Sequence, residues 1–362
     1  MSIWYIYPVF KHVSFTTIAE KHIKELKKKF WVETLDESAI PFFSFSTRPT
    51  VLLHPYFYPL QKYEKKIQNL SLHVDGLIGV DVADSNRISD YAVYLTNYAD
   101  ALIVPSNFSR DAYINSGVKK PVHIIPHGVD DDWLDIAKQD AYSIPNLELA
   151  KRRGYKLLLS FMMHSEYRKG YDLLNKIYTR VRRERNDVRL VIKAIDGVWL
   201  ADRRAEDRLT ITTKGWLSER ELMVLFDNCD LYLLTSRGGG FEHPPLQGLA
   251  RGLPMIGAKG GSWEDYMPTW AGVDSKPSGV VLQGNPIHTG VGFEIDVDKA
   301  VDKVLYMLDN LDDFKARTEE YANTVIRENF TWSKIGEKLI KLVRDVEINA
   351  SLRATVQQSK RP

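Results

Sequence analysis

Short apolar runs alternate with amphipathic stretches along most of the chain. Apolar runs of about four to eight residues are typical of buried strands. The predicted strands cover residues 2–7, 51–54, 76–80, 101–106 and 122–126 in the first half, and 155–162, 188–194, 209–215, 231–236 and 253–258 in the second. Strands that alternate with helices form a parallel sheet with helices on its faces. The pattern therefore predicts an α/β protein with two Rossmann-like, doubly wound parallel-sheet domains.

Helical patterns lie between these runs. Residues 18–31 place Ile18, Ile23, Leu26 and Phe30 close to the helical period, which predicts an amphipathic helix. Further helices are predicted at 109–117, 170–184, 218–228, 245–251 and 298–309, and a long amphipathic one at 331–348.

The place where the alternation stops predicts the domain organisation. Between residues 133 and 154 the pattern fades into polar residues, which indicates a linker. The length of the chain also favours two domains. The predicted parts are an N-terminal domain at 1–140, a linker at 141–154, a C-terminal domain at 155–330, a helix at 331–348 that crosses back to the N-terminal domain, and a polar, frayed tail at 349–362.

Composition narrows the class of protein. The chain has 362 residues and a formal net charge of +2, so it has no global attraction to nucleic acid or to an anionic membrane. Cys229 is the one cysteine, and the N-terminal sequence lacks the basic start and long apolar core of a secretory signal. No uncharged apolar run approaches the roughly twenty residues that span a bilayer. The expected location is the reducing cytoplasm.

Three consecutive glycines, Gly238 to Gly240, stand between a predicted strand and a helix expected to begin at Pro244 or Pro245. Backbone N–H groups at a helix N-terminus attract anions, and glycine lets a ligand approach the backbone closely. A tight strand-to-helix turn without a ligand is the alternative interpretation. A glycine loop alone does not decide between the two.

A second stretch, "HSEYRKGYDLL" at 164–174, has the same order of strand, loop and helix. Arg168 and Lys169 stand immediately before Gly170, where the helix is expected to begin. Arginine offers a bidentate fork and lysine a point charge to phosphate oxygens. A solvated basic pair is the alternative, so this stretch is also indecisive alone.

Together and in this order, these stretches resemble the glycosyltransferases of the GT-B fold, specifically the large retaining group that uses nucleotide-sugar donors. "VHIIPHGVDDDW" is similar to the family's "IPNGVD" turn, with His127 in the place of the usual Asn, and "RKGYDLL" is similar to its diphosphate-binding helix start. "LYLLTSRGGGFEHPPLQGLARGLP" resembles its donor site, and "ENFTWSKIGEKLIKLV" its closing helix. The resemblance implies a donor such as a UDP- or GDP-sugar on the C-terminal domain, the acceptor on the N-terminal domain, and chemistry in the cleft between them. The donor-binding residues that it implies are Ser236, Gly239, Gly240, Phe241, Leu246 and Gln247.

The donor site departs from the family's pattern "EGFGLPxLEA" at both glutamates. Gly239 stands where the first glutamate belongs and Gln247 where the second belongs. In the family the second glutamate is implied to hold the ribose hydroxyls, and the carbonyl of Gln247 can accept one such hydrogen bond. Glu242 replaces the second glycine of the pattern and is predicted to reach the donor sugar. An exposed loop carboxylate is the alternative for Glu242.

Acceptor-side candidates lie in the first half of the chain. Asp81 and Asp84 follow a predicted strand and His54 ends another, so they are candidates for the acceptor side together with His127. Helix capping is the alternative for the aspartates, and a structural role is the alternative for His54. The histidines show no zinc-ligand spacing, and "DVD" at 296–298 is interpreted as helix capping, so no metal and no cofactor are predicted.

The predicted function is sugar transfer from a nucleotide-diphosphate sugar to a hydroxyl of a glycan, lipid-linked or protein acceptor. Retention without metal is favoured, with Arg168, Lys169 and Glu242 as catalytic residues and the departing diphosphate as base. An inverting transferase, with His54, Asp81 or Asp84 as base, and a non-catalytic nucleotide-sugar-binding subunit are the alternatives. A dinucleotide oxidoreductase is disfavoured, because no G-x-G-x-x-G follows a predicted strand.

Contact with a membrane is a separate hypothesis for residues 18–31. This stretch carries five lysines beside Phe30 and Trp31, a composition that can lie on an anionic leaflet as a peripheral contact. A solvated helix face is the alternative.

Overall fold

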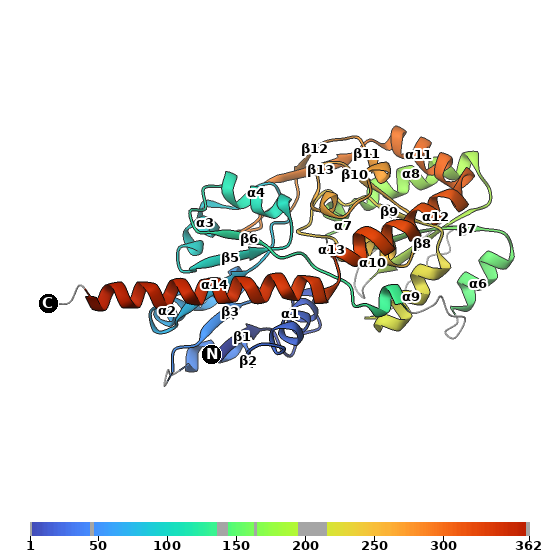
Figure 1. The fold of residues 1–362 in the computed structure, drawn as a ribbon. Helices are drawn as coiled ribbons and strands as arrows, with labels where there is room; N and C mark the ends of the chain where they lie inside the picture. The colour runs from blue at the N-terminus through green and yellow to red at the C-terminus, as the bar shows by residue number, and fades with distance from the viewer. Residues whose placement is uncertain (1, 44–46, 136–143, 163–164, 195–215, 360–362) are drawn as a thin grey trace. The chain divides into compact units, whose positions relative to one another are not determined.

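The computed structural model describes residues 2–43, 47–135, 144–162, 165–194 and 216–359. Contacts between residues divide the chain into two compact units, and Figure 1 labels most of their helices and strands. Unit 1 consists of Met1–His127, Gly284–Thr289 and Trp332–Pro362, and unit 2 of Gly128–Gln283 and Gly290–Thr331. Each unit is built on a parallel sheet, which confirms the predicted α/β class.

The sheet of unit 1 has six strands in the order β2-β1-β3-β4-β5-β6, and all neighbours are parallel. The strands are β1 (Ser2–Tyr7), β2 (Trp31–Asp36), β3 (Thr50–Leu53), β4 (Gly76–Val80), β5 (Ala101–Val104) and β6 (Val122–Ile124). The helices are α1 (Ser14–Leu26), η1 (Glu37–Phe42), α2 (Phe57–His73), α3 (Asp90–Thr96), α4 (Asn107–Asn115) and α14 (Trp332–Ser359). The apolar pattern predicted each of these strands except β2.

Helices cover both faces of this sheet. Successive strand residues point to opposite faces, so Tyr5 and Leu52 belong to the apolar cluster that includes α1 and α14. Ile6 and Leu53 belong instead to the cluster formed with α2, α3 and α4. Burial on both faces explains why these strands are continuous apolar runs in the sequence.

Strand β2 corrects the predicted helix at 18–31. The helix α1 ends at Leu26, and Trp31 already begins β2. Only Val32 of this edge strand is buried, and Trp31 is 72% exposed. An edge strand with so few buried residues has no clear apolar alternation, and the lysines before it favour a helical interpretation of the sequence.

Unit 2 has a five-stranded sheet in the order β11-β10-β9-β7-β8, again with parallel neighbours, and a two-stranded antiparallel hairpin. The strands are β7 (Lys156–Met162), β8 (Val188–Ala194), β9 (Leu231–Leu234), β10 (Met255–Ala258), β11 (Gly272–Val273), β12 (Ser275–Val280) and β13 (Val291–Ile295). The helices are α5 (Asp132–Asp135), α6 (Pro145–Arg152), α7 (Glu166–Lys169), α8 (Tyr171–Glu184), α9 (Glu219–Asn228), α10 (His243–Ala250), η2 (Ser262–Asp265), η3 (Thr269–Ala271), α11 (Val297–Asp309), α12 (Leu311–Tyr321), η4 (Ala322–Ile326) and α13 (Arg327–Asn329). The strand predicted at 209–215 lies outside the described residues.

The boundary between the units differs from the predicted one at residue 140. Unit 2 already begins at Gly128, and the predicted linker contains α6. Trp133 is 1% exposed and packs against Phe226 with ring centroids 5.9 Å apart, and Leu147 is fully buried. These few large apolar side chains anchor the segment to unit 2, but they are too widely spaced to give a periodic pattern.

Two further segments depart from the predicted organisation. The closing helix, expected at 331–348, continues as α14 to Ser359, into the stretch predicted to be a frayed tail. The predicted C-terminal domain is interrupted at 284–289, which belongs to unit 1. There Ile287 is 5% exposed, and its carbonyl oxygen accepts a hydrogen bond from Ser89 N at 2.8 Å. Such pairing between distant segments leaves no periodic trace in the sequence.

The described helices were also compared with the requirements of a membrane span. None of them is both long enough and apolar enough to cross a membrane.

Candidate active site

The α7–α8 turn lies directly against the end of strand β9 in unit 2. Gly170 joins the two helices with φ of 68°, and a Cβ at this position would lie 2.0 Å from the carbonyl oxygen of Thr235. Thr235 Oγ1 donates to Lys169 O at 3.1 Å, and Arg237 N donates to Arg168 O at 2.7 Å. Backbone contacts therefore hold Arg168 and Lys169 beside the start of the glycine loop.

Lys169 and Glu242 form a close ion pair at this point. Lys169 Nζ lies 2.6 Å from Oε1 and 2.7 Å from Oε2 of Glu242. Arg168 Nη1 lies 3.8 Å from the same Oε1 and donates to Gly238 O at 3.2 Å. The side chains of Arg168, Lys169 and Glu242 are only 14%, 12% and 5% exposed. The structure thus brings the three residues predicted as catalytic into one cluster.

The backbone at Glu242 fixes where its carboxylate lies. Glu242 immediately precedes α10 and has φ of 61°, a conformation that costs free energy for a residue other than glycine. A Cβ on Gly239 would lie 2.4 Å from Glu242 Oε1, so the carboxylate occupies the space where a side chain at position 239 would begin. Tyr266 Oη donates to Glu242 O at 2.5 Å. The alternative of an exposed loop carboxylate is therefore wrong.

The other predicted donor-binding residues surround this cluster, and all of them are buried. Gly239, Gly240 and Ser236 belong to the connection between β9 and α10. Phe241 packs against Tyr266 with ring centroids 5.1 Å apart. The remaining two are in α10, where Leu246 is 0% and Gln247 9% exposed. Because Phe241 and Leu246 are packed in the apolar core, only their backbone is suited to meet a donor.

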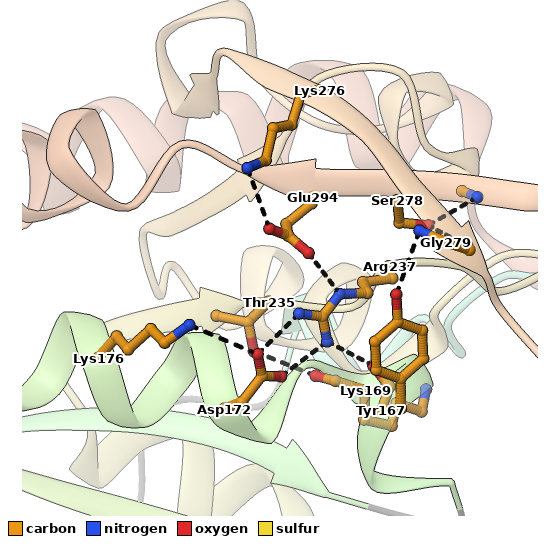
Figure 2. A network of polar contacts seen from close by, with 11 residues as sticks. Tyr167, Lys169, Asp172, Lys176, Thr235, Arg237, Lys276, Ser278, Gly279 and Glu294 are labelled. Atoms are coloured by element: carbon orange, nitrogen blue, oxygen red, sulfur yellow. Dashed lines mark hydrogen bonds and ion pairs between the residues drawn. The ribbon is translucent and has the colours of Figure 1, made fainter.

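Arg237, which the sequence analysis did not single out, lies at the centre of a polar network in this unit (Figure 2). Its guanidinium donates to both carboxylate oxygens of Asp172, at 2.7 and 2.8 Å, and to Glu294 Oε2 at 2.9 Å. The signal available in the sequence was an arginine placed between a buried strand and the glycine triplet. Glu294 lies 57 positions further along the chain, so the sequence pattern gave no reason to pair the two.

On unit 1, His54 lies in a buried cluster with Tyr5 and His22. Tyr5 Oη lies 2.9 Å from His22 Nδ1 and 3.0 Å from His54 Nδ1, and the two imidazoles stack with ring centroids 6.0 Å apart. One hydroxyl donates only one proton, so the phenol donates to one ring and accepts from the other. His54 is 3% exposed, which supports the structural role that was its alternative.

The remaining acceptor-side candidates also belong to unit 1. Asp81 is 6% exposed, and its Oδ2 accepts from Tyr56 N and Phe57 N, both at 2.9 Å, at the start of α2. Asp84 is half-buried, and its backbone N donates to His288 Nδ1 at 3.3 Å. His127 is half-buried at the end of the first segment of unit 1. Asp81 therefore caps a helix, but the helix is α2, which precedes it in the chain, and not the following helix that the alternative interpretation expected; that helix, α3, is capped by Ser89.

The "DVD" stretch is placed as the sequence analysis expected. Asp296 is the N-cap of α11, and its side chain accepts from Lys299 N at 3.1 Å. Within the described residues, no group of three or more His, Cys, Asp or Glu side chains is arranged to hold a metal ion.

The buried histidines predict a loss of stability in acid. Burial lowers the pKa of His22 to about 4, and burial and His22 lower the pKa of His54 as well. Because the unfolded state takes up protons first, stability should be full above pH of about 6.5 and fall toward pH 4, by about 1.4 kcal/mol per pH unit for His22. Urea denaturation between pH 7 and pH 4 measures this slope.

His22→Gln should remove one proton's share of that slope, because glutamine does not titrate. His73→Gln is the matched control, since His73 is an exposed histidine of the same unit. An unchanged slope in His22→Gln would show that His22 does not titrate between the folded and unfolded states.

Gly170→Ala is expected to destabilise unit 2 by at least about 2 kcal/mol, since it adds a clash to a left-handed backbone. Gly154→Ala is the matched control, because Gly154 also has a positive φ, of 83°, but a Cβ there meets nothing within 4 Å. The control should cost only about 1 kcal/mol, the left-handed penalty alone. Equal losses in thermal or urea denaturation would mean that the contact with Thr235 relaxes at no cost.

Comparisons with known proteins agree with this arrangement. A family model described as "Glycosyl transferases group 1" matches residues 156–273. The chain is 33% identical over 353 residues to "Uncharacterized protein 356" of Sulfolobus islandicus rod-shaped virus 1, covering 94% of this chain and 98% of that one. It is 26% identical over 276 residues to "Putative glycosyltransferase 45" of Sulfolobus islandicus filamentous virus (isolate Iceland/Hveragerdi), covering 73% and 72%. Sucrose-phosphate synthase from Thermosynechococcus elongatus has a similar fold, with a TM-score of 0.66 at 12% identity over 95% of this chain and 98% of that one.

The two parallel-sheet units and the similarity in fold place the structure in the GT-B class, as the resemblance implied. Residues 156–273 carry the pattern of the glycosyl transferases group 1, and the chain is a glycosyltransferase. The matched residues include the α7–α8 turn, the glycine loop and α10. The part of the chain that carries the family's pattern therefore also carries the cluster of Arg168, Lys169 and Glu242.

Proposed function

We propose that the chain transfers a sugar from a nucleotide-diphosphate sugar to an acceptor hydroxyl, and that unit 2 binds the donor. The observation that carries this proposal is the convergence of Arg168 and Lys169 on the start of α10, beside Gly238. Two cations and the N-terminus of a helix together favour the negative charge of a diphosphate. Gly238 and Gly240 have no side chains and let a sugar approach the backbone closely. The space beside Gly239 holds the carboxylate of Glu242.

Glu242 takes the place of the family's missing first glutamate in this proposal. Its carboxylate, although three positions later in the chain, lies against Gly239, the position of the absent glutamate. A carboxylate there can accept hydrogen bonds from the hydroxyls of the donor sugar. Gln247 would serve the ribose through its side-chain carbonyl, as a neutral replacement for the second glutamate.

Retention without metal fits the charges of this site. The bond between the anomeric carbon and the diphosphate oxygen breaks, and its electrons move to that oxygen. The acceptor oxygen bonds to the same face of the sugar, and its proton passes to the departing diphosphate. Arg168 and Lys169 would stabilise the negative charge that develops on the departing diphosphate. A bound metal ion can stabilise such a charge in the same way.

The inverting alternative requires a general base on the acceptor side. His54 is buried against Tyr5, and Asp81 accepts hydrogen bonds from backbone N–H groups, which leaves neither well suited to remove a proton. These contacts disfavour inversion through His54 or Asp81, and half-buried Asp84 is the candidate base that remains for the inverting alternative. The acceptor class, whether glycan, lipid-linked or protein, stays a prediction.

Peripheral membrane contact through residues 18–31, from the cytoplasmic side, also stays a prediction. The apolar residues Ile18, Ile23 and Leu26 of α1 are already buried in unit 1. Phe30 is half-buried against the same cluster, which leaves Trp31 as the exposed apolar side chain beside the lysines. This supports at most a weak, salt-dependent contact.

The proposal is tested by incubating the purified chain with UDP- and GDP-sugars and a panel of glycan and lipid-linked acceptors. Transfer should occur in the presence of a chelator, and nuclear magnetic resonance of the product should show the anomeric configuration of the donor. An inverted product contradicts retention. Binding of donor without any turnover would favour the non-catalytic subunit instead.

A further inference from the structure

Arg237 is a buried charge whose hydrogen bonds come from separate segments of unit 2. Its side chain is 3% exposed and makes a bidentate pair with Asp172 on α8. Nε donates to Glu294 on β13, and Nη1 donates to Tyr167 O at 2.8 Å. The guanidinium also stacks on the Tyr167 ring, 4.2 Å from its centroid. A planar fork that bonds along two edges and stacks on one face is beyond the geometry of lysine.

The backbone of Arg237 joins the same segments. Its N–H donates to Arg168 O at 2.7 Å, and its carbonyl accepts from Phe293 N at 2.8 Å. A Cβ on Gly292 would lie 1.8 Å from that carbonyl, so the hairpin strand β13 packs directly against the loop. Figure 2 shows the side chain enclosed between the α7–α8 turn and the β12–β13 hairpin.

Each carboxylate that binds Arg237 also lies near a lysine. Hydrogen bonds from Arg237 lower the pKa of Asp172 below its ordinary value, which keeps that carboxylate ionised. Lys176 and Lys276 lie further out, 4.0 Å from Asp172 and 3.5 Å from Glu294. Removing the guanidinium would leave the carboxylates of Asp172 and Glu294 without the cation that they share, and mutual repulsion would separate the segments that carry them.

We infer that Arg237 is a positioning residue that fixes Arg168 and Lys169 relative to the glycine loop Gly238–Gly240. Its side chain acts without touching the donor, because the guanidinium is already hydrogen-bonded to Asp172, Glu294 and Tyr167. This inference rests on the proposed function, since it assumes that Arg168 and Lys169 bind the donor diphosphate.

The test compares Arg237→Lys with Arg251→Lys by calorimetry, using UDP against uridine and GDP against guanosine. Arg251 is a matched control: it is also 3% exposed, pairs with both oxygens of Asp227 at 2.8 and 2.7 Å, and donates to Trp133 O. Arg237→Lys should weaken binding of the nucleoside diphosphate about 10-fold or more, because Arg168 and Lys169 would no longer be held where they bind the phosphates. Binding of the nucleoside, which has no phosphate, should be unchanged. Arg251→Lys should lower the melting temperature but keep the ratio of the two affinities.

The inference is overturned if Arg237→Lys leaves the ratio of the affinities for nucleoside diphosphate and nucleoside unchanged. It is also overturned if Arg251→Lys changes this ratio as much as Arg237→Lys does. If Arg237→Lys does not fold, Asp172→Asn and Glu294→Gln replace it, since these side chains are 46% and 22% exposed and tolerate neutralisation better. Both should show the same selective loss, and its absence from both overturns the inference. Failure of the proposed function is seen separately, as a wild-type chain that binds UDP and GDP no more tightly than their nucleosides.

Discussion

Replacing Arg168 and Lys169 together with alanine is expected to weaken binding of a nucleoside diphosphate about 100-fold, because each charge-assisted hydrogen bond to phosphate contributes about 1.5 kcal/mol or more. Binding of the free nucleoside should hardly change, since it has no phosphate to lose. Titration calorimetry of the two ligands on wild type and variant measures the difference directly.

Arg182→Ala with Arg183→Ala is the matched control for this pair. These two arginines have the same total charge but lie in the last turn of α8, at the end of that helix far from Gly170, whereas Arg168 and Lys169 end α7 immediately before Gly170. Their removal should leave both affinities unchanged. Equal losses for diphosphate and nucleoside in the Arg168 and Lys169 variant would mean that the two cations stabilise unit 2 and do not bind phosphate.

Turnover should fall about 100-fold in Glu242→Gln, whereas affinity for the nucleoside diphosphate should not weaken. Glutamine keeps the shape of the side chain but loses the charge that the sugar meets as its bond to the diphosphate breaks. Lys169, which the carboxylate engages at 2.6 Å, also becomes more available to phosphate. Initial rates with saturating donor, together with calorimetry of the diphosphate, separate the two effects.

Glu264→Gln is the control for this variant, because Glu264 is an exposed carboxylate of the same unit. It should transfer sugar at the wild-type rate. If Glu242→Gln also does so, the carboxylate beside Gly239 has no part in the reaction, and its pairing with Lys169 is only structural.

The sequence by itself determined most strands of both sheets. Parallel strands are buried on both faces, so each tends to be a short apolar run that stands out from its surroundings, as at 76–80 and 101–104. The edge strand β2 did not stand out, because only Val32 among its residues is buried. Helices α5 and α6 were not predicted for a related reason, since Trp133 and Leu147 bury them without giving the sequence a regular apolar period.

The sequence also determined which short stretches form the donor end of unit 2. The glycine triplet and Gly170 are visible in the sequence itself, and at Gly170 the left-handed backbone requires glycine. Arg168 and Lys169 are adjacent to Gly170 in the chain. The displaced glutamate was visible as a departure from the family's pattern. These residues are neighbours in the sequence, and so their local chemistry can be recognised from the sequence alone.

Only the tertiary structure decided which partners these residues have. The contact of Glu242 with Lys169 joins positions 73 apart, and that of Arg237 with Glu294 joins positions 57 apart. No periodic pattern records such pairs, because they arise when strand ends and hairpins fold onto the same edge of a sheet. Burial was decided in the same way: His54 and Asp81 follow strands just as catalytic residues do, but packing around them turned one into part of a histidine cluster and the other into a helix cap.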